Sequence, residues 1–186
     1  MPSFFKFVDR TPEEAEKVQN LQGRIATAGL AYIFTDTACL RFLRGREGNE
    51  DEAFEYMQNH DRWRIENNVD SLVAGDAQAK GKVQRFGRDK SDRPIVVILA
   101  RRHFKKDRDL EELRRNFIFE LEGLIKACDP VQEQLTIIFD LTQFSMKNMD
   151  YDLVKMLLDV LEYNYPEILG QSYIVSAVLC WVEVKV

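Results

Sequence analysis

The chain has 186 residues, of which 45% are hydrophobic and 12 are Phe, so it can bury a sizeable core and is not expected to be disordered. Its formal net charge of −5 argues against a general nucleic-acid binder. The cysteines Cys39, Cys128 and Cys180 are widely spaced and form no CxxC pair, which favours a reducing compartment over a disulfide-stabilised scaffold.

The first 75 residues are predicted to form a helical lobe. Thr11 to Glu14 combine a capping box with a proline in the first turn, which predicts the start of a helix, and Gly29 is a suitable end for it. A second helix contains Leu40 to Arg44 and ends near Gly45. A third is predicted to begin at Asn49, because Asn49 and the acidic residue three positions later form a capping pair. We therefore place an N-terminal helical lobe at residues 1–75.

Small and polar residues between Asn67 and Ser91 predict the boundary of this lobe. From there, residues 76–186 alternate between β-branched runs and apolar residues at helical spacing, which predicts an α/β lobe with a parallel or mixed sheet flanked by helices. The expected strands and helices are, in order, 94–100, 110–124, 135–139, 149–161 with Asn148 as its cap, and 173–178.

A basic stretch runs from Lys80 to Lys106, where ten Lys and Arg face two Asp, so it carries +8 and the remainder −13. Such a cluster can attract phosphates or anionic lipid headgroups. The alternative is that it consists of solvated strand flanks. His103 follows Arg101 and Arg102 at the end of a predicted strand and adds to the stretch when protonated.

Motifs of catalysis are missing or incomplete. No GxGxxG follows a strand and no GxSxG is present; Gly75 to Val83 resembles a phosphate-binding loop, but Val83 replaces the required Ser or Thr. With His60 and His103 as the two histidines, zinc sites have few candidates, and the polar neighbours of His60 indicate a solvated helix position. Asp140 ends a predicted strand and is expected to cap a loop. We therefore expect no enzyme, metal or cofactor, and a site that binds something apolar.

Several ordered segments resemble the CRAL-TRIO lipid-binding family. Leu40 to Arg46, with Trp63-Arg64 further on, is similar to the family's helical lead-in. Asp89 to Val97 resembles its turn into a sheet strand, with an Asp at the usual Gly position. The most specific segments are Phe139 to Ser145 and the Tyr-Pro-Glu corner at Tyr165 to Gly170. Together they cover nearly the whole chain.

The resemblance implies a sheet that floors an apolar pocket, closed by a mobile gate helix. It implies that the protein binds a phospholipid of the phosphatidylinositol type, or another small hydrophobic ligand, and transfers it between membranes. The protein is then expected to be cytoplasmic and transiently peripheral to anionic membrane surfaces. The expected headgroup residues are Arg46, Ser145 and Glu167. The expected pocket residues are Ile98, Ile138 and Phe144.

Two alternatives stay open for the headgroup residues. The Glu167 carboxylate can instead be paired within the fold, and the Ser145 hydroxyl can cap the next helix. Glu47 stands where phosphoinositide binders commonly have Lys, and Ile168 replaces the Arg of the corner, which makes a lipid a firmer expectation than phosphatidylinositol.

The resemblance ends at Ala177, and Val178 to Val186 does not match the family's gate region. We therefore expect a C-terminally truncated version that lacks the gate. Two other functions follow from that expectation: a non-transferring module for membrane recruitment or GTPase regulation, and a truncated product without lipid-binding activity.

Overall fold

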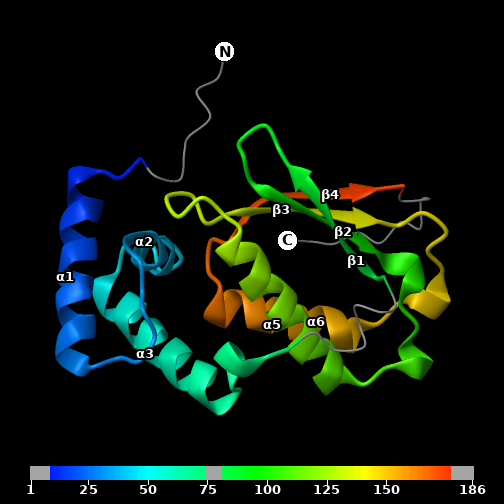
Figure 1. Cartoon of the computed structure of the whole chain (residues 1–186), viewed down its shortest axis with the longest axis horizontal. Helices are drawn as coiled ribbons and strands as arrows, with labels where there is room; N and C mark the ends of the chain where they lie inside the picture. Colours follow the sequence, from blue (N-terminus) through cyan, green and yellow to red (C-terminus); the bar gives the residue numbers. More distant parts are fainter. Residues whose placement is uncertain (1–8, 74–80, 177–186) are drawn as a thin grey trace.

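The computed structural model describes residues 9–73 and 81–176, so most of the Gly75–Val83 stretch and the Val178–Val186 tail lie outside the described residues. The first lobe contains α1 (Pro12–Ala28), α2 (Asp36–Arg44) and α3 (Glu50–Glu66), at the left of Figure 1. The predicted caps are confirmed. Thr11 forms the capping box of α1, Gly29 ends it with φ 64°, and the Asn49 side chain accepts backbone hydrogen bonds at the start of α3.

The second lobe is a mixed α/β layer, as predicted. Its sheet has the order β1-β2-β3-β4, with β1 antiparallel to β2 and the other neighbours parallel. The strands are β1 (Val83–Arg88), β2 (Pro94–Leu99), β3 (Leu135–Asp140) and β4 (Leu169–Val175). The helices are α5 (Leu110–Lys126) and α6 (Tyr151–Asn164), and the short 3-10 helices are η1 (Val69–Ser71), η2 (Ala100–Arg102), η3 (Lys105–Asp107) and η4 (Met146–Asn148).

Helices α5 and α6 lie on the same face of the sheet (Figure 1). This follows from the topology, because right-handed crossovers between consecutive parallel neighbours place successive helices on one side. Among the described residues, no helix covers the opposite face. The sheet therefore has one face packed against α5 and α6 and one face, the open side, that no helix of the described residues covers.

Strand β1 falls inside the region that the sequence analysis took as a polar boundary. All six of its residues are exposed, and its sequence, VQRFGR, has no alternation of apolar and polar residues that would have predicted a strand. It is held in the sheet by antiparallel pairing with β2, where Val83 lies opposite Ile98.

The predicted cap of α6 was wrong. Asp150 is the N-cap, and the Asn148 side chain accepts a hydrogen bond from the Ser145 backbone instead.

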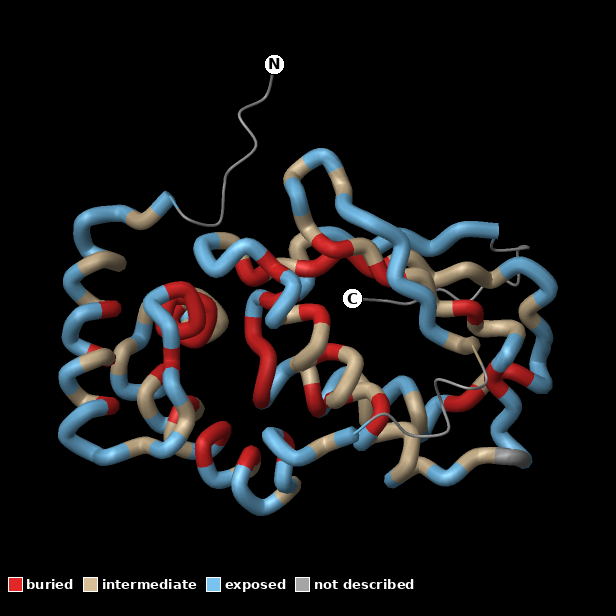
Figure 2. Tube along the Cα trace, viewed as in Figure 1, coloured by how far each residue is buried: buried red, intermediate tan, exposed pale blue. Residues whose placement is uncertain are grey.

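Two buried clusters form the core (Figure 2). The first lies among α1, α2 and α3, and the second lies between the sheet and α5 and α6. Trp63 of α3 packs against the second cluster, so the two lobes share an interface. The largest fully buried side chains are Phe42, Leu21, Leu40, Leu43, Met57, Ile118, Leu135 and Ile168.

His60 lies in this interface, so its predicted solvated position was wrong. It is 2% exposed, and its ring lies 5.2 to 5.8 Å from the ring centroids of Tyr32, Trp63 and Tyr165. Its neighbours in sequence are polar, but helical spacing places His60 on the same face as the buried Met57. Burial, reinforced by the nearby positive charge, lowers the pKa of His60 to about 3.

Candidate functional site

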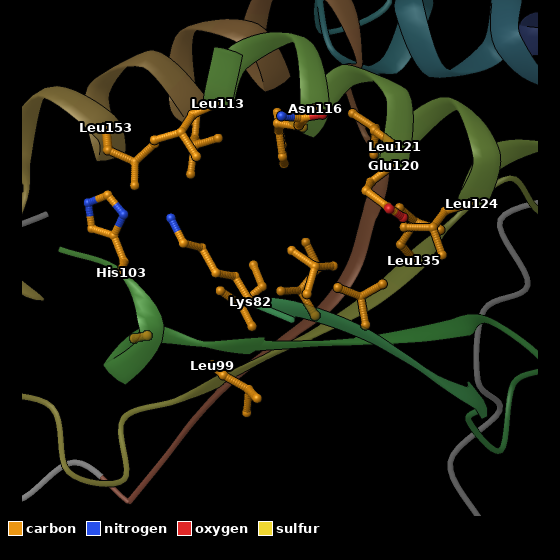
Figure 3. Close-up of a pocket in the computed structure, with 17 residues that line it drawn as sticks. Lys82, Leu99, His103, Leu113, Asn116, Glu120, Leu121, Leu124, Leu135 and Leu153 are labelled. Carbon is orange, nitrogen blue, oxygen red and sulfur yellow. The ribbon is translucent and has the colours of Figure 1, made fainter. Parts of the chain in front are cut away.

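An apolar cavity of about 130 Å³ lies between the sheet and helices α5 and α6. Its volume is close to that of an engineered apolar cavity of about 150 Å³ that takes up benzene. Figure 3 shows the α5 side chains facing the sheet across the cavity. The walls include Val96 and Ile98 of β2, Ile137 of β3, Leu113 and Phe117 of α5, and Leu157 of α6.

The predicted pocket residues do not come together. Ile98 lines the cavity, and it is paired with Phe139 across the parallel strands β2 and β3. Ile138 is one residue earlier and therefore faces the open side of the sheet. Phe144 lies in the turn beyond the carboxyl end of β3, where its N–H donates to Leu141.

Lys82 and His103 occupy one end of the cavity (Figure 3). His103, which was expected to add to the basic stretch when protonated, is 7% exposed, and its Nε2 lies 2.9 Å from Oδ2 of Asp150. Asp150 also accepts hydrogen bonds from Arg108. Burial alone raises the pKa of Asp150, but the hydrogen bonds from Arg108 and His103 outweigh it and lower the pKa to about 2. The carboxylate therefore stays ionised at neutral pH.

Two of the three predicted headgroup residues share a groove. Arg46 and Glu167 both line a surface groove of about 440 Å³ beside the Tyr165-Pro166 corner. The Arg46 guanidinium lies 3.4 Å from the centroid of the Tyr56 ring. Glu167 is exposed, and within the described part of the chain no hydrogen bond or ion pair engages its carboxylate. An exposed carboxylate in the same groove as a guanidinium can accept hydrogen bonds from hydroxyl groups of a ligand while the guanidinium binds an anion.

The third headgroup residue, Ser145, lies elsewhere. It follows the carboxyl end of β3, whereas Glu167 precedes the amino end of the parallel strand β4. Its hydroxyl donates to Oδ1 of Asn148 at 3.0 Å, and its backbone N–H donates to the same atom at 2.8 Å. Ser145 is the N-cap residue of the 3-10 helix η4, which agrees with the alternative in which it caps the next helix.

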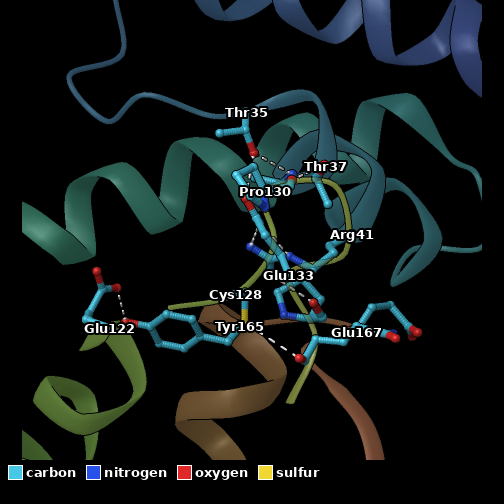
Figure 4. A network of polar contacts seen from close by, with 12 residues as sticks. Thr35, Thr37, Arg41, Glu122, Cys128, Pro130, Glu133, Tyr165 and Glu167 are labelled. Carbon is cyan, nitrogen blue, oxygen red and sulfur yellow. Dashed lines mark hydrogen bonds and ion pairs between the residues drawn. The ribbon is translucent and has the colours of Figure 1, made fainter. Parts of the chain in front are cut away.

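A buried polar network holds the corner that carries Glu167, and the sequence analysis missed it (Figure 4). Arg41 of α2 donates to the Glu133 carboxylate at 3.1 and 3.2 Å and to the Pro166 carbonyl at 3.1 Å. Thr35 donates to the other oxygen of Glu133 at 2.9 Å. The available signal was an arginine inside an apolar helical segment, because such a residue needs a buried acidic partner.

A second network joins α3 to α5 and to the same corner. Arg64 donates to Glu122 at 2.6 and 3.1 Å. The Tyr165 hydroxyl donates to Glu122 at 2.7 Å, as Figure 4 shows. The Arg64 guanidinium also lies 4.1 Å from the centroid of the Tyr32 ring. The helical lobe therefore fixes the position of the corner through both networks.

The basic stretch is partly neutralised by local partners. Arg85 pairs with Glu120 at 3.0 Å, and Arg93 pairs with Asp89 at 2.8 Å. Arg101 lies 2.9 Å from Asp140, which also accepts the backbone N–H two residues later, as expected of a loop cap. Pairing of this kind reduces the field that a distant phosphate experiences.

Several other features bear on function. In residues 9–73 and 81–176, no group of three His, Cys, Asp or Glu side chains is placed to hold a metal ion. No helix in the same ranges is long and apolar enough to cross a bilayer. Cys39 and Cys128 are buried free thiols, and burial raises their pKa values to about 12 and about 11. Both thiols therefore stay protonated at neutral pH.

Comparison with known proteins gives consistent matches. The family described as CRAL/TRIO domain matches residues 78–180. A CRAL-TRIO domain-containing protein of Schizosaccharomyces pombe is 32% identical over 192 residues, covering 92% of this chain and 43% of the relative. The phosphatidylinositol transfer protein CSR1 of Eremothecium gossypii is 34% identical over 163 residues, covering 77% of this chain and 36% of the relative. The chain thus spans less than half the length of these two curated relatives.

The fold is also found in a solved structure. The crystal structure of Sfh5 matches with a TM-score of 0.74 at 15% sequence identity. The match covers 89% of this chain and 71% of that chain. At this identity the likeness shows a shared fold.

Proposed function

Because this chain belongs to the CRAL/TRIO domain family, we propose that it binds a lipid whose apolar part enters the cavity between the sheet and helices α5 and α6. The observation that carries the proposal is the apolar wall of that cavity. Each methylene group that leaves water for such a site contributes about 0.8 kcal/mol. The cavity of about 130 Å³ accommodates a short stretch of chain, so a long acyl chain extends beyond it.

For the headgroup we propose the groove that contains Arg46 and Glu167, with a phosphatidylinositol-like phospholipid as the ligand class. The guanidinium suits a phosphate, and the exposed carboxylate suits the hydroxyl groups of a polyol. Leu157 of α6 lines the cavity and Leu158 lines the groove, so the two sites lie on different faces of that helix. We place Ser145 outside this site, because its hydroxyl is engaged in a local turn.

We further propose that the protein carries lipid between membranes and catalyses no reaction, working in the cytoplasm with transient attachment to membrane surfaces. A relative of 34% identity is a phosphatidylinositol transfer protein by name, which supports this assignment. A carrier needs to shield an acyl chain from water, and the cavity between the sheet and α5 offers such shielding.

The test is to incubate the full chain with vesicles that contain phosphatidylinositol and phosphatidylcholine, isolate the protein, and identify its lipids by mass spectrometry. We expect one lipid class to be enriched on folded protein relative to the vesicles. A folded sample that retains no lipid would overturn the proposal. Salt-sensitive sedimentation with the vesicles, without lipid uptake, would instead indicate a recruitment module.

A further inference from the structure

Two segments that are far apart in the sequence form one surface at the carboxyl ends of β2 and β3. Residues 100–108 follow β2, and residues 140–152 run from the end of β3 into the first turn of α6. The Asn148 side chain joins the segments, because it donates to the backbone carbonyls of Arg101 at 3.2 Å and of His103 at 2.8 Å. We call this the η3–η4 surface; it lies at the right of Figure 1.

The η3–η4 surface exposes three large apolar side chains. They are Met146 of η4, which is 75% exposed, Tyr151 at the start of α6, and Phe104 beside η3. Exposed apolar side chains that gather on one surface are typical of a site that contacts another protein or a membrane. The charge of the surface separates these two kinds of partner.

The η3–η4 surface is positive, although the chain as a whole is negative. Residues 100–108 and 140–152 contain six Lys and Arg and four Asp, so they carry a formal charge of +2, whereas the whole chain carries −5. Asp152 is already paired with Lys105 at 3.1 Å. Lys147 is exposed and has no acidic partner among the described residues. Lysines beside exposed apolar side chains suit an anionic membrane, because the ammonium groups attract the headgroups and the apolar side chains enter the boundary with the acyl chains.

The η3–η4 surface also adjoins the cavity between the sheet and helices α5 and α6. His103 belongs to the first segment and Leu153 directly follows the second, and both line the same end of the cavity (Figure 3). A membrane in contact with this surface therefore lies next to one end of the proposed acyl site.

We propose that the η3–η4 surface docks on membranes that contain anionic phospholipid, and that lipid is exchanged at the adjoining end of the cavity. The inference rests on the proposed function and adds the surface through which the lipid passes. Met146 and Tyr151 provide the apolar contact, and Lys147 provides an unpaired positive charge. Docking acts at contact distance, so the local ion pairs that weaken the field at long range do not abolish it.

The test is sedimentation of the full chain with two kinds of vesicle, phosphatidylcholine alone and phosphatidylcholine with phosphatidylserine in a ratio of four to one. We expect binding to the anionic vesicles that weakens as the salt concentration rises. Lys147→Glu should weaken this binding about tenfold and Met146→Ser about fivefold. Lys90→Glu, in the turn between β1 and β2, and Ile33→Ser, between α1 and α2, make equivalent changes at exposed positions elsewhere and should bind like the parent chain.

Three results would overturn the docking surface. The first is an equal loss of vesicle binding in the two control variants, which would show that binding is spread over the molecule. The second is a parent chain that takes up lipid but sediments with neither kind of vesicle. The third is a dimer, measured by light scattering, that Met146→Ser converts to a monomer, because the surface would then bind a second copy of the chain.

A lipid in monomeric form separates this inference from the proposed function. Dihexanoyl phosphatidylinositol, kept below its critical micelle concentration, reaches the cavity without a membrane. Lys147→Glu and Met146→Ser should bind it like the parent chain but take up lipid from anionic vesicles several-fold more slowly. Equal uptake rates from vesicles in the parent and both variants would refute the docking surface and leave the proposed function intact. A parent chain that docks as expected and binds neither form of lipid would refute the proposed function and leave the docking surface intact.

Discussion

The Arg41 guanidinium lies 3.1 Å from a carboxylate oxygen of Glu133, although the two residues are 92 positions apart in the sequence. Their side chains are 4% and 9% exposed, so the ion pair is buried. Arg41 belongs to α2 and Glu133 precedes β3, so the pair joins the helical lobe to the sheet. Because Arg41 also bonds to the Pro166 carbonyl, it holds the corner that presents Glu167.

Arg41→Met should lower the free energy of unfolding by about 3 to 5 kcal/mol, because it leaves the Glu133 carboxylate buried without its partner. The measurement is urea unfolding followed by circular dichroism. Arg24→Met is the control: its pair with Asp51 is exposed, and its loss should cost at most about 1 kcal/mol. Equal losses in the two variants would show that the buried pair has no special role.

Leu157→Phe should reduce lipid uptake, because Leu157 lines the cavity and the larger ring occupies space that an alkyl chain needs. Val154→Phe is a matched control on the same helix, on a side chain that is 51% exposed and lines neither the cavity nor the groove. Lipid retained after vesicle incubation, measured by mass spectrometry, should fall several-fold in the first variant and stay unchanged in the second. Similar uptake by both variants would place the acyl site outside this cavity.

The sequence predicted the α/β class and the caps of α1 and α3, because capping boxes and apolar spacing act locally. It did not predict β1, whose exposed residues are ordered by pairing with β2. It also misjudged His60, because the burial of this ring comes from residues distant in the sequence such as Tyr165. It gave no sign of the contact between His103 and Asp150, which are 47 positions apart. Arg46 and Glu167 came from a family resemblance, and the structure places them in one groove.

Glu167→Gln should weaken selection of phosphatidylinositol over phosphatidylcholine by about tenfold, because a neutral amide is a weaker acceptor for hydroxyl groups than a carboxylate. The side chain is exposed, so the free energy of unfolding should change by less than about 0.5 kcal/mol. Glu16→Gln, on an exposed position of α1, is the control. The measurement is the ratio of the two lipids recovered from mixed vesicles. An unchanged ratio in Glu167→Gln would remove this residue from the headgroup site.

Acid should destabilise the protein through His60 well before its carboxylates titrate. The folded pKa of about 3 lies below the ordinary histidine value of 6.5, so between these values the unfolded chain binds a proton that the folded chain does not. The free energy of unfolding therefore decreases as the pH is lowered, by about 2 kcal/mol from pH 7 to pH 5. Asp150, with a folded pKa of about 2, adds to the loss only below about pH 4, outside that range.

The check is urea unfolding at several pH values between 7 and 5, for the parent chain and for His60→Phe. Phe fits among the aromatic rings around position 60 and cannot take up a proton, so the variant should lose most of the pH dependence whatever its absolute stability. NMR signals of the His60 ring should show a neutral imidazole throughout the range. An equal slope in both proteins, or a protonated His60 at pH 5, would mean that the interface between the lobes admits water to this ring.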